Sequence, residues 1–329
     1  MVPPPLSAAL TEAPRPALIV FGPTASGKSA LAVALARRLN GTVINADSMQ
    51  VYRELRILTA RPTPAEEAEV AHALYGVRSA AEASSVAWWR EAALAAMAAA
   101  RERGRVPILC GGTGLYLAAL TRGLARIPDP GEAARAEARG LLAALGPAAL
   151  HARLAEADPA TAARLRPSDG QRIARAWEVW RGTGRSLAAW QLEPAAPAPG
   201  WRFAAILLDP PRAELRATIA ARFGQMLAQG AVEEVRALLA LRLDPALPAM
   251  RAHGVPEIAA FLRGGITIEE AARLAVLATG QYAKRQATWR RGRPLTEAPT
   301  HTIHARFAGS AQFSESILSE IGDFLRHPG

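Results

Sequence analysis

The chain has 329 residues, of which 50% are hydrophobic, a formal net charge of +10 and one cysteine. This length allows a large core and about two domains, and the lack of a long uncharged apolar run excludes a membrane-spanning helix. The lone cysteine excludes a disulfide framework and favours the cytoplasm, whereas the basic excess favours a polyanionic partner, with compositional drift towards arginine as the alternative.

The first recognisable elements follow a proline-rich leader, residues 1–16, which we expect to be disordered. Residues 18–21 are rich in strand formers, residues 22–29 have the sequence GPTASGKS, and residues 28–39 have the apolar spacing of a helix. The octapeptide matches the phosphate-binding pattern G-x-x-x-x-G-K-[ST], in the strand–loop–helix context that this pattern requires. A ligand with a di- or triphosphate is therefore predicted to bind here.

Each residue type in this loop would contribute to phosphate binding in a different way. The glycines let backbone N–H groups turn towards one anion, and the following helix adds its positive end. Lys28 brings a full positive charge, and the hydroxyl of Ser29 can bind a Mg²⁺ shared with phosphate oxygens. The expected phosphate-binding residues are Gly22, Pro23, Thr24, Ala25, Ser26, Gly27, Lys28 and Ser29.

A second strand is predicted at residues 42–45, and Asp47 follows it directly. Because the carboxyl ends of parallel strands line the ligand crevice, Asp47 is expected beside the phosphate loop. It could serve there as a Mg²⁺ ligand, a general base or a helix cap. After a helix at residues 88–103, a strand at 105–110 ends in glycines and Thr113 rather than in the aspartate of a phosphohydrolase, which argues against a motor-type NTPase.

The sequence pattern changes between residues 127 and 200. This region contains helical stretches bounded by proline and glycine, and no strand pattern occurs in it. We expect an inserted helical domain at 127–200 within a discontinuous α/β core made of residues 17–126 and 201–329. The predicted fold class is a parallel sheet flanked by helices, as in P-loop NTPases. Arg172 and Arg175 share a helical face in the insert, either solvated or in contact with phosphate.

The last part of the chain is predicted to contain a strand at 201–208, a long helical region at 214–243 and a loop at 250–257. A helix at 268–289 ends in a mixture of basic and aromatic residues, which suits a single-stranded or looped nucleic acid or, alternatively, a solvated surface. The only lysines are Lys28 and Lys284, so the second becomes a weaker functional candidate. The tail beyond residue 293 gives no pattern.

Seven segments of the chain resemble the bacterial tRNA dimethylallyltransferases. They are GPTASGKS at 22–29, NADSMQVY at 45–52, TARP at 59–62, VPILCGGTGLYL at 106–117, RLRPSDGQRIARAWEVWRGTG at 164–184, ARFGQML at 221–227 and YAKRQATWRR at 282–291. They follow the order of that family and cover most of residues 17–291. The chain departs from the family pattern at Thr218, at Gly280 and at Val255-Pro256, and these departures affect expected tRNA contacts.

The resemblance implies transfer of a dimethylallyl group from dimethylallyl diphosphate to N6 of adenosine 37, in tRNAs that read codons beginning with U. It implies Asp47 as the general base and Thr24 and Arg222 on the diphosphate oxygens. The expected cofactor is the Mg²⁺ that the phosphate-loop pattern predicts at Ser29. The implied partner is the anticodon stem-loop, bound by a cytoplasmic enzyme expected to be a monomer. Together with the basic helix end, the expected tRNA contacts are Asp47, Ser48, Met49, Gln50, Thr113, Arg135, Gln171, Arg172, Ile173, Ala174, Arg175, Arg251, His253, Gly254, Lys284 and Arg285.

Two other functions fit part of the pattern. A small-molecule kinase of the same fold would use Asp47 as a base towards a hydroxyl and would bind ATP in the loop, without a large basic surface. An ATP-gated RNA-binding module would need a hydrolysis carboxylate, and the sequence offers none. Whether ATP binds to the loop at all is left open.

Overall fold

The structure is a computed structural model that describes residues 14–193, 196–290, 295–296, 300–308 and 315–326. It divides into two compact units, residues 1–121 with 198–329, and residues 122–197. Most of the predicted leader lies outside the described residues. Its last two residues, however, are not disordered: Arg15 and Pro16 begin the first strand, and the N–H of Arg15 donates a hydrogen bond to the carbonyl of Gly200 (2.8 Å).

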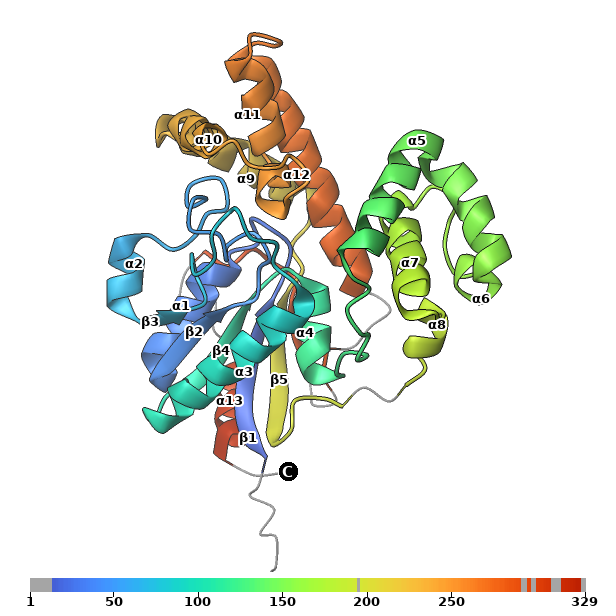
Figure 1. Ribbon diagram of the computed structural model, residues 1–329. Helices are drawn as coiled ribbons and strands as arrows, with labels where there is room; N and C mark the ends of the chain where they lie inside the picture. The colour runs from blue at the N-terminus through green and yellow to red at the C-terminus, as the bar shows by residue number, and fades with distance from the viewer. Residues whose placement is uncertain (1–13, 194–195, 291–294, 297–299, 309–314, 327–329) are drawn as a thin grey trace, which may run out of the picture. The chain divides into compact units, whose positions relative to one another are not determined.

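The larger unit is built on a parallel sheet whose described strands have the order β3-β2-β4-β1-β5-β6 (Figure 1). The strands are β1 (Arg15–Phe21), β2 (Gly41–Asn45), β3 (Ala71–Ala73), β4 (Val106–Gly111), β5 (Trp201–Leu208) and β6 (Thr300–Ile303). The predicted α/β fold with a P-loop-like parallel sheet is confirmed. Because β1 pairs with both β4 and β5, the phosphate loop follows an interior strand at the carboxyl end of the sheet.

Helices cover both faces of the sheet, as a parallel sheet requires. The described helices of this unit are α1 (Lys28–Leu39), α2 (Pro64–Glu69), α3 (Val86–Glu102), α4 (Gly114–Thr121), α9 (Arg212–Ala228), α10 (Ala231–Ala240), a 3₁₀ turn (Pro248–Arg251), α11 (Val255–Leu262), α12 (Ile268–Arg290) and α13 (Glu315–Arg326). Alternate residues of β1 point to opposite faces: Leu18 and Val20 pack with α1, whereas Ile19 and Phe21 belong to a core that includes Trp89 of α3.

Three predicted elements differ from the structure. The helical region at 214–243 is two helices, because Gly230 adopts a left-handed conformation (φ 101°) and ends the first one. The predicted loop at 250–257 already contains the start of α11, whose first turn accommodates Pro256 since proline has no N–H to lose there. The tail beyond residue 293 adds the edge strand β6 and helix α13, which no sequence pattern had indicated.

The smaller unit consists of helices only within its described residues, in agreement with the lack of a strand pattern. Its helices are α5 (Glu132–Ala157), α6 (Pro159–Ala162), α7 (Gly170–Thr183) and α8 (Leu187–Trp190). Leu150 and Leu154 of α5 pack with Ile173 and Val179 of α7 in a separate core. Among the helices that the structure describes, none combines the length and apolarity needed to cross a bilayer.

Candidate active site

The phosphate loop has the backbone geometry of an anion-binding turn. Ala25 (φ 66°) and Gly27 (φ 88°) adopt left-handed conformations, which turn neighbouring N–H groups towards one side of the loop. Helix α1 begins directly after Gly27 without a side-chain cap, so the N–H groups of its first turn are available to a ligand. Glycine is required at position 27, because the backbone carbonyl of Phe307 occupies the space that a Cβ would need.

Two cations flank this loop. The ammonium of Lys28 lies 3.5 Å from the carbonyl oxygen of Pro23, folded back over the loop. Burial lowers the pKa of Lys28, while Asp47 and Cys110 act in the opposite direction. Arg222, the second residue of ARFGQML on α9, donates from Nη2 to the hydroxyl of Thr24 (3.4 Å). Burial lowers the pKa of Arg222, while Asp47 acts in the opposite direction. A guanidinium remains charged in proteins, so Arg222 adds a second positive charge at the loop.

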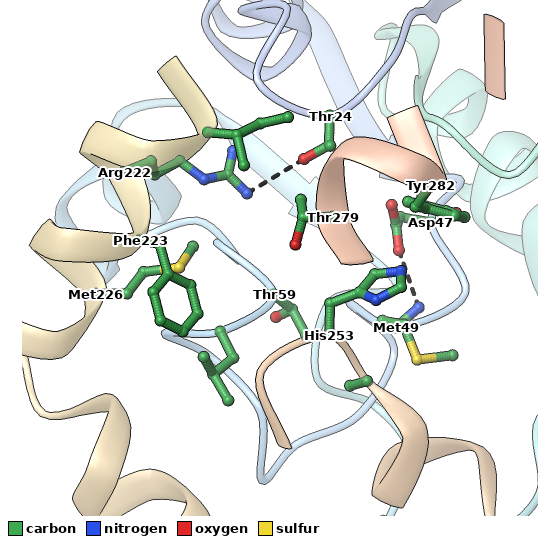
Figure 2. Close-up of a pocket in the computed structure, with 13 residues that line it drawn as sticks. Thr24, Asp47, Met49, Thr59, Arg222, Phe223, Met226, His253, Thr279 and Tyr282 are labelled. Carbon is green, nitrogen blue, oxygen red and sulfur yellow. Dashed lines mark hydrogen bonds between the residues drawn. The ribbon is translucent and has the colours of Figure 1, made fainter. Parts of the chain in front are cut away.

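Asp47 is held at the end of β2 by a compact turn. Its N–H donates to Oδ1 of Asn45 (2.8 Å), and its own Oδ1 accepts from the N–H of Met49 (2.9 Å). Asn45 is itself fixed, because its Nδ2 donates to the carbonyls of Asp47 and Leu74, each at 3.0 Å. The carboxylate therefore combines a turn-capping role through one oxygen with a place on the wall of a cavity, shown in Figure 2.

This cavity has a polar and an apolar end. Thr24 and Arg222 form the polar end at the phosphate loop, and Asp47 lies across the cavity from them, beside Met49, His253 and Tyr282. The apolar wall comes from α9 and the loop after β2, and its residues are Met49, Leu58, Ile219, Phe223 and Met226. Such an arrangement suits a ligand with an anionic head and a short hydrocarbon tail, because each part meets matching chemistry.

An aromatic pair completes the cavity wall. The rings of His253 and Tyr282 lie with their centroids 5.0 Å apart and their planes tilted by 48°. Burial and the neighbouring Arg285 lower the pKa of His253, while Glu257 and Asp47 oppose that shift. Burial raises the pKa of Tyr282 well above the ordinary value, while the side chains of Thr113 and Gln286 act in the opposite direction. Both rings are therefore uncharged at neutral pH, next to the carboxylate.

Some of the predicted tRNA contacts line the cavity, and others hold the surrounding loops in place. Met49 and His253 line the cavity. Gln50 is buried instead, and its amide donates to the carbonyls of Thr59 (2.8 Å) and Ala60 (3.0 Å), so its side chain holds the chain's own loop. Thr113 accepts a hydrogen bond from the N–H of Ser48 (3.0 Å), which links the two strand ends.

The predicted tRNA contacts outside the cavity are mostly exposed. Arg251, Lys284 and Arg285 of the larger unit and Gln171, Arg172 and Arg175 of the smaller unit are exposed. Gly254 is buried and caps α11 in a left-handed conformation (φ 97°). Arg135 forms ion pairs with Asp129 and Glu132, and Ala174 is half-buried.

The predicted contact between the side chain of Ile173 and tRNA is wrong. Ile173 is 0% exposed and packs inside the core of the smaller unit. The helical period explains the error: positions 172 and 175 share the outer face of α7, whereas position 173 faces inwards. A side chain without exposed surface cannot reach a nucleic acid.

Sequence reasoning missed several cavity residues, and the signal for them was weak. Thr59, Phe223, Met226 and Tyr282 lie within quoted motifs but had no individual role, while Leu58, Ile219, Ala252 and Thr279 lie outside every quoted motif. Five of these residues lie on α9 or α12, which are neighbours in space although far apart in the sequence, whereas Leu58, Thr59 and Ala252 lie in loops. Helical periodicity alone cannot tell an inner wall from an ordinary core.

The residues present fit a magnesium ion at the phosphate loop. Ser29 follows Lys28 at the start of α1 and is exposed, and its hydroxyl is a hard oxygen donor that contacts the thiol of Cys110. Within the residues that the structure describes, no group of three or more His, Cys, Asp or Glu could form an all-protein cage. Mg²⁺ commonly uses one or two protein oxygens together with phosphate oxygens and water, so the Ser29 hydroxyl matches that donor set.

The fold and the loop together define the class of this protein. A parallel sheet with a glycine-bounded phosphate loop between an interior strand and the first helix is the arrangement of P-loop α/β proteins. The chain belongs to the IPP transferase family, because the model of that family matches residues 50–293. The matched range contains Arg222, His253 and Tyr282 of the cavity.

Individual relatives agree over nearly the whole chain. A tRNA dimethylallyltransferase of Granulibacter bethesdensis is 63% identical over 311 residues, covering 94% of this chain and 98% of the relative. One of Gluconobacter oxydans is 59% identical over 321 residues, covering 97% of each chain. The crystal structure of a tRNA isopentenylpyrophosphate transferase from Bacillus halodurans is similar at 32% identity, with a TM-score of 0.67 and coverage of 94% of this chain and 96% of that one.

Proposed function

We propose that this protein transfers a dimethylallyl group from dimethylallyl diphosphate to N6 of adenosine 37, in tRNAs that read codons beginning with U, and releases diphosphate. The observation that carries this proposal is the two-ended cavity: cationic beside the phosphate loop, apolar along α9, with Asp47 on its wall. Relatives named tRNA dimethylallyltransferase support the choice of donor and acceptor.

The reaction breaks the bond between C1 of the prenyl group and the diphosphate oxygen, and it forms a bond between C1 and N6 of the adenine. An exocyclic adenine amine is a weak nucleophile, so the departure of diphosphate has to be made easy. The loop N–H groups, Lys28 and Arg222 face the charge that develops on the leaving oxygen. When bound, Mg²⁺ at Ser29 supplies further neutralisation of the diphosphate charge.

The proton that N6 loses goes to the carboxylate of Asp47. Its turn leaves this group fixed, with Oδ1 bonded to the N–H of Met49, so little reorientation is needed. The apolar side chains Leu58, Phe223 and Met226 receive the five-carbon group and exclude water from the reacting carbon. The uncharged rings of His253 and Tyr282 offer a surface for the acceptor base, which leaves its stack more readily in an anticodon loop than in a duplex.

The remaining parts of the proposal concern partners. The exposed Arg172, Arg175, Lys284 and Arg285 would contact the anticodon stem-loop, the first two from the inserted helical domain. A monomer in the cytoplasm fits a tRNA-modifying enzyme with one buried cysteine. The cavity does not support the kinase alternative, because phosphoryl transfer to a small hydroxyl substrate does not require an apolar wall.

One experiment tests the function directly. The protein is incubated with Mg²⁺, dimethylallyl diphosphate and unmodified tRNA that carries adenosine 37, and the tRNA is then analysed by mass spectrometry after nuclease digestion. We expect one C₅H₈ unit on that adenosine and one diphosphate released per unit. A tRNA of unchanged mass, together with consumption of ATP on a small hydroxyl substrate, would favour the kinase.

A further inference from the structure

Gln286 is a buried amide that joins two loops of the larger unit, and the mechanism above does not use it. It lies on α12 and is 4% exposed. Its Oε1 accepts a hydrogen bond from the N–H of Thr24 (2.9 Å), and its Nε2 donates to the carbonyl of Gly112 (3.0 Å). Only one orientation of the amide satisfies both partners, since one is a donor and the other an acceptor. The side chain thus ties the phosphate loop to the loop after β4.

The neighbouring backbone is shaped around this amide. A Cβ at Gly112 would overlap Nε2 of Gln286, so the glycine at this position is needed for the close approach. Because Gln286 already uses the N–H of Thr24, the tip of the phosphate loop cannot move without breaking that bond. A buried backbone donor left without a partner costs about 1–3 kcal/mol, which keeps the amide in place.

The loop after β4 connects this amide with the turn of the general base. Gly112, whose carbonyl accepts from Gln286, directly precedes Thr113, and the N–H of Thr113 donates to the carbonyl of Ala46 (3.3 Å). Thr113 in turn accepts from the N–H of Ser48 (3.0 Å), the residue next to Asp47. The chain of contacts therefore begins at the residue that touches Arg222 and ends at the turn that holds the carboxylate.

We propose that Gln286 is a positioning residue that sets the separation between the phosphate loop, which holds the donor, and Asp47, which receives the proton of the acceptor. The inference rests on the proposed prenyl transfer and deepens it. Reacting atoms have to lie about 3–3.5 Å apart, and a displacement of about 1 Å costs about 10²-fold in rate. A link that fixes both loops therefore acts on the chemical step rather than on the binding of tRNA.

The first test replaces Gln286 with methionine, which has a similar volume and cannot make either hydrogen bond. With both substrates saturating, we expect kcat to fall about 10- to 100-fold while the KM for tRNA changes less than about threefold. Gln281→Met, at an exposed position of the same helix, is the matched control and should leave kcat unchanged. A Gln286→Met variant that keeps kcat within threefold of the unaltered protein would overturn the proposal.

The second test measures the pH dependence of kcat for Gln286→Glu. If Gln286 only stabilised the fold, the ratio of variant to wild-type kcat would not change with pH. A protonated glutamic acid can accept from Thr24 and donate to Gly112 as the amide does, whereas the carboxylate places an oxygen against the carbonyl of Gly112. Burial raises the pKa of such a carboxyl group, so it stays protonated on the acid side of neutrality. We expect the ratio of variant to wild-type kcat to rise at least about tenfold between about pH 8 and about pH 6.

A ratio that does not change with pH would contradict the positioning role, even if the variant is slow. The unaltered protein is measured in the same assay, which separates the two proposals. If it adds no prenyl group to tRNA, the proposed function fails; if it is active and the Gln286 variants match it, only the role of Gln286 fails. Thermal unfolding of each variant gives the folded fraction by which kcat is corrected.

Discussion

The assignment of Asp47 as general base makes a quantitative prediction for Asp47→Asn. Asparagine retains an Oδ1 that can accept from the N–H of Met49, and the bond from the residue 47 N–H to Asn45 involves the backbone only. The turn should therefore persist, and the variant should lose only the proton acceptor. General-base catalysis contributes about 10²–10⁴ in rate, which corresponds to about 2.7–5.4 kcal/mol in the activation free energy.

The assay is single-turnover prenyl transfer with saturating dimethylallyl diphosphate, followed by separate measurement of tRNA affinity by filter binding. We expect the rate to fall about 10²–10⁴-fold and the affinity for tRNA to stay within several-fold. Asp244→Asn is a matched control, because Oδ1 of Asp244 accepts from the N–H of Ala246 (2.7 Å) in a similar turn. A rate within threefold of wild type, or weakened tRNA binding with an intact rate, would refute the reasoning.

Three further predictions concern charge. Arg222→Gln should lower kcat/KM for the donor about 10²–10³-fold, because it removes a donor that faces the leaving diphosphate, and steady-state kinetics with unchanged tRNA affinity would check this. The affinity for tRNA should fall steeply with added salt, and Arg172→Ala should reduce the slope of log K against log salt by about one; a flat response would assign the charge of +10 to composition alone. Burial raises the pKa of the Cys110 thiol to about 11, so the thiol is protonated at pH 8. Iodoacetamide should therefore label the native protein at least about 10²-fold more slowly than the unfolded chain. Equal labelling rates would contradict the burial of this thiol.

The sequence determined the parts of the site that depend on local chemistry. The spacing of glycines and Lys28 predicts the loop and the start of α1, because glycine permits the left-handed turn at position 27 and the lysine brings the positive charge. The placement of Asp47 beside the loop follows from a general rule, since the carboxyl ends of parallel strands meet at one edge. The boundaries of α1 and β5 were predicted to the residue, as strong periodicity and glycine stops define them.

Only the tertiary structure decided which distant residues complete the site. Thr24 and Gln286 are 262 positions apart and are neighbours because α12 packs against the phosphate loop. The pattern of α12 marks its buried face but does not say what lies against it, and the same holds for Phe223 and Met226 of α9. Hydrogen bonds and apolar contacts between elements depend on the packing of the whole chain, whereas a sequence motif predicts only the local backbone conformation.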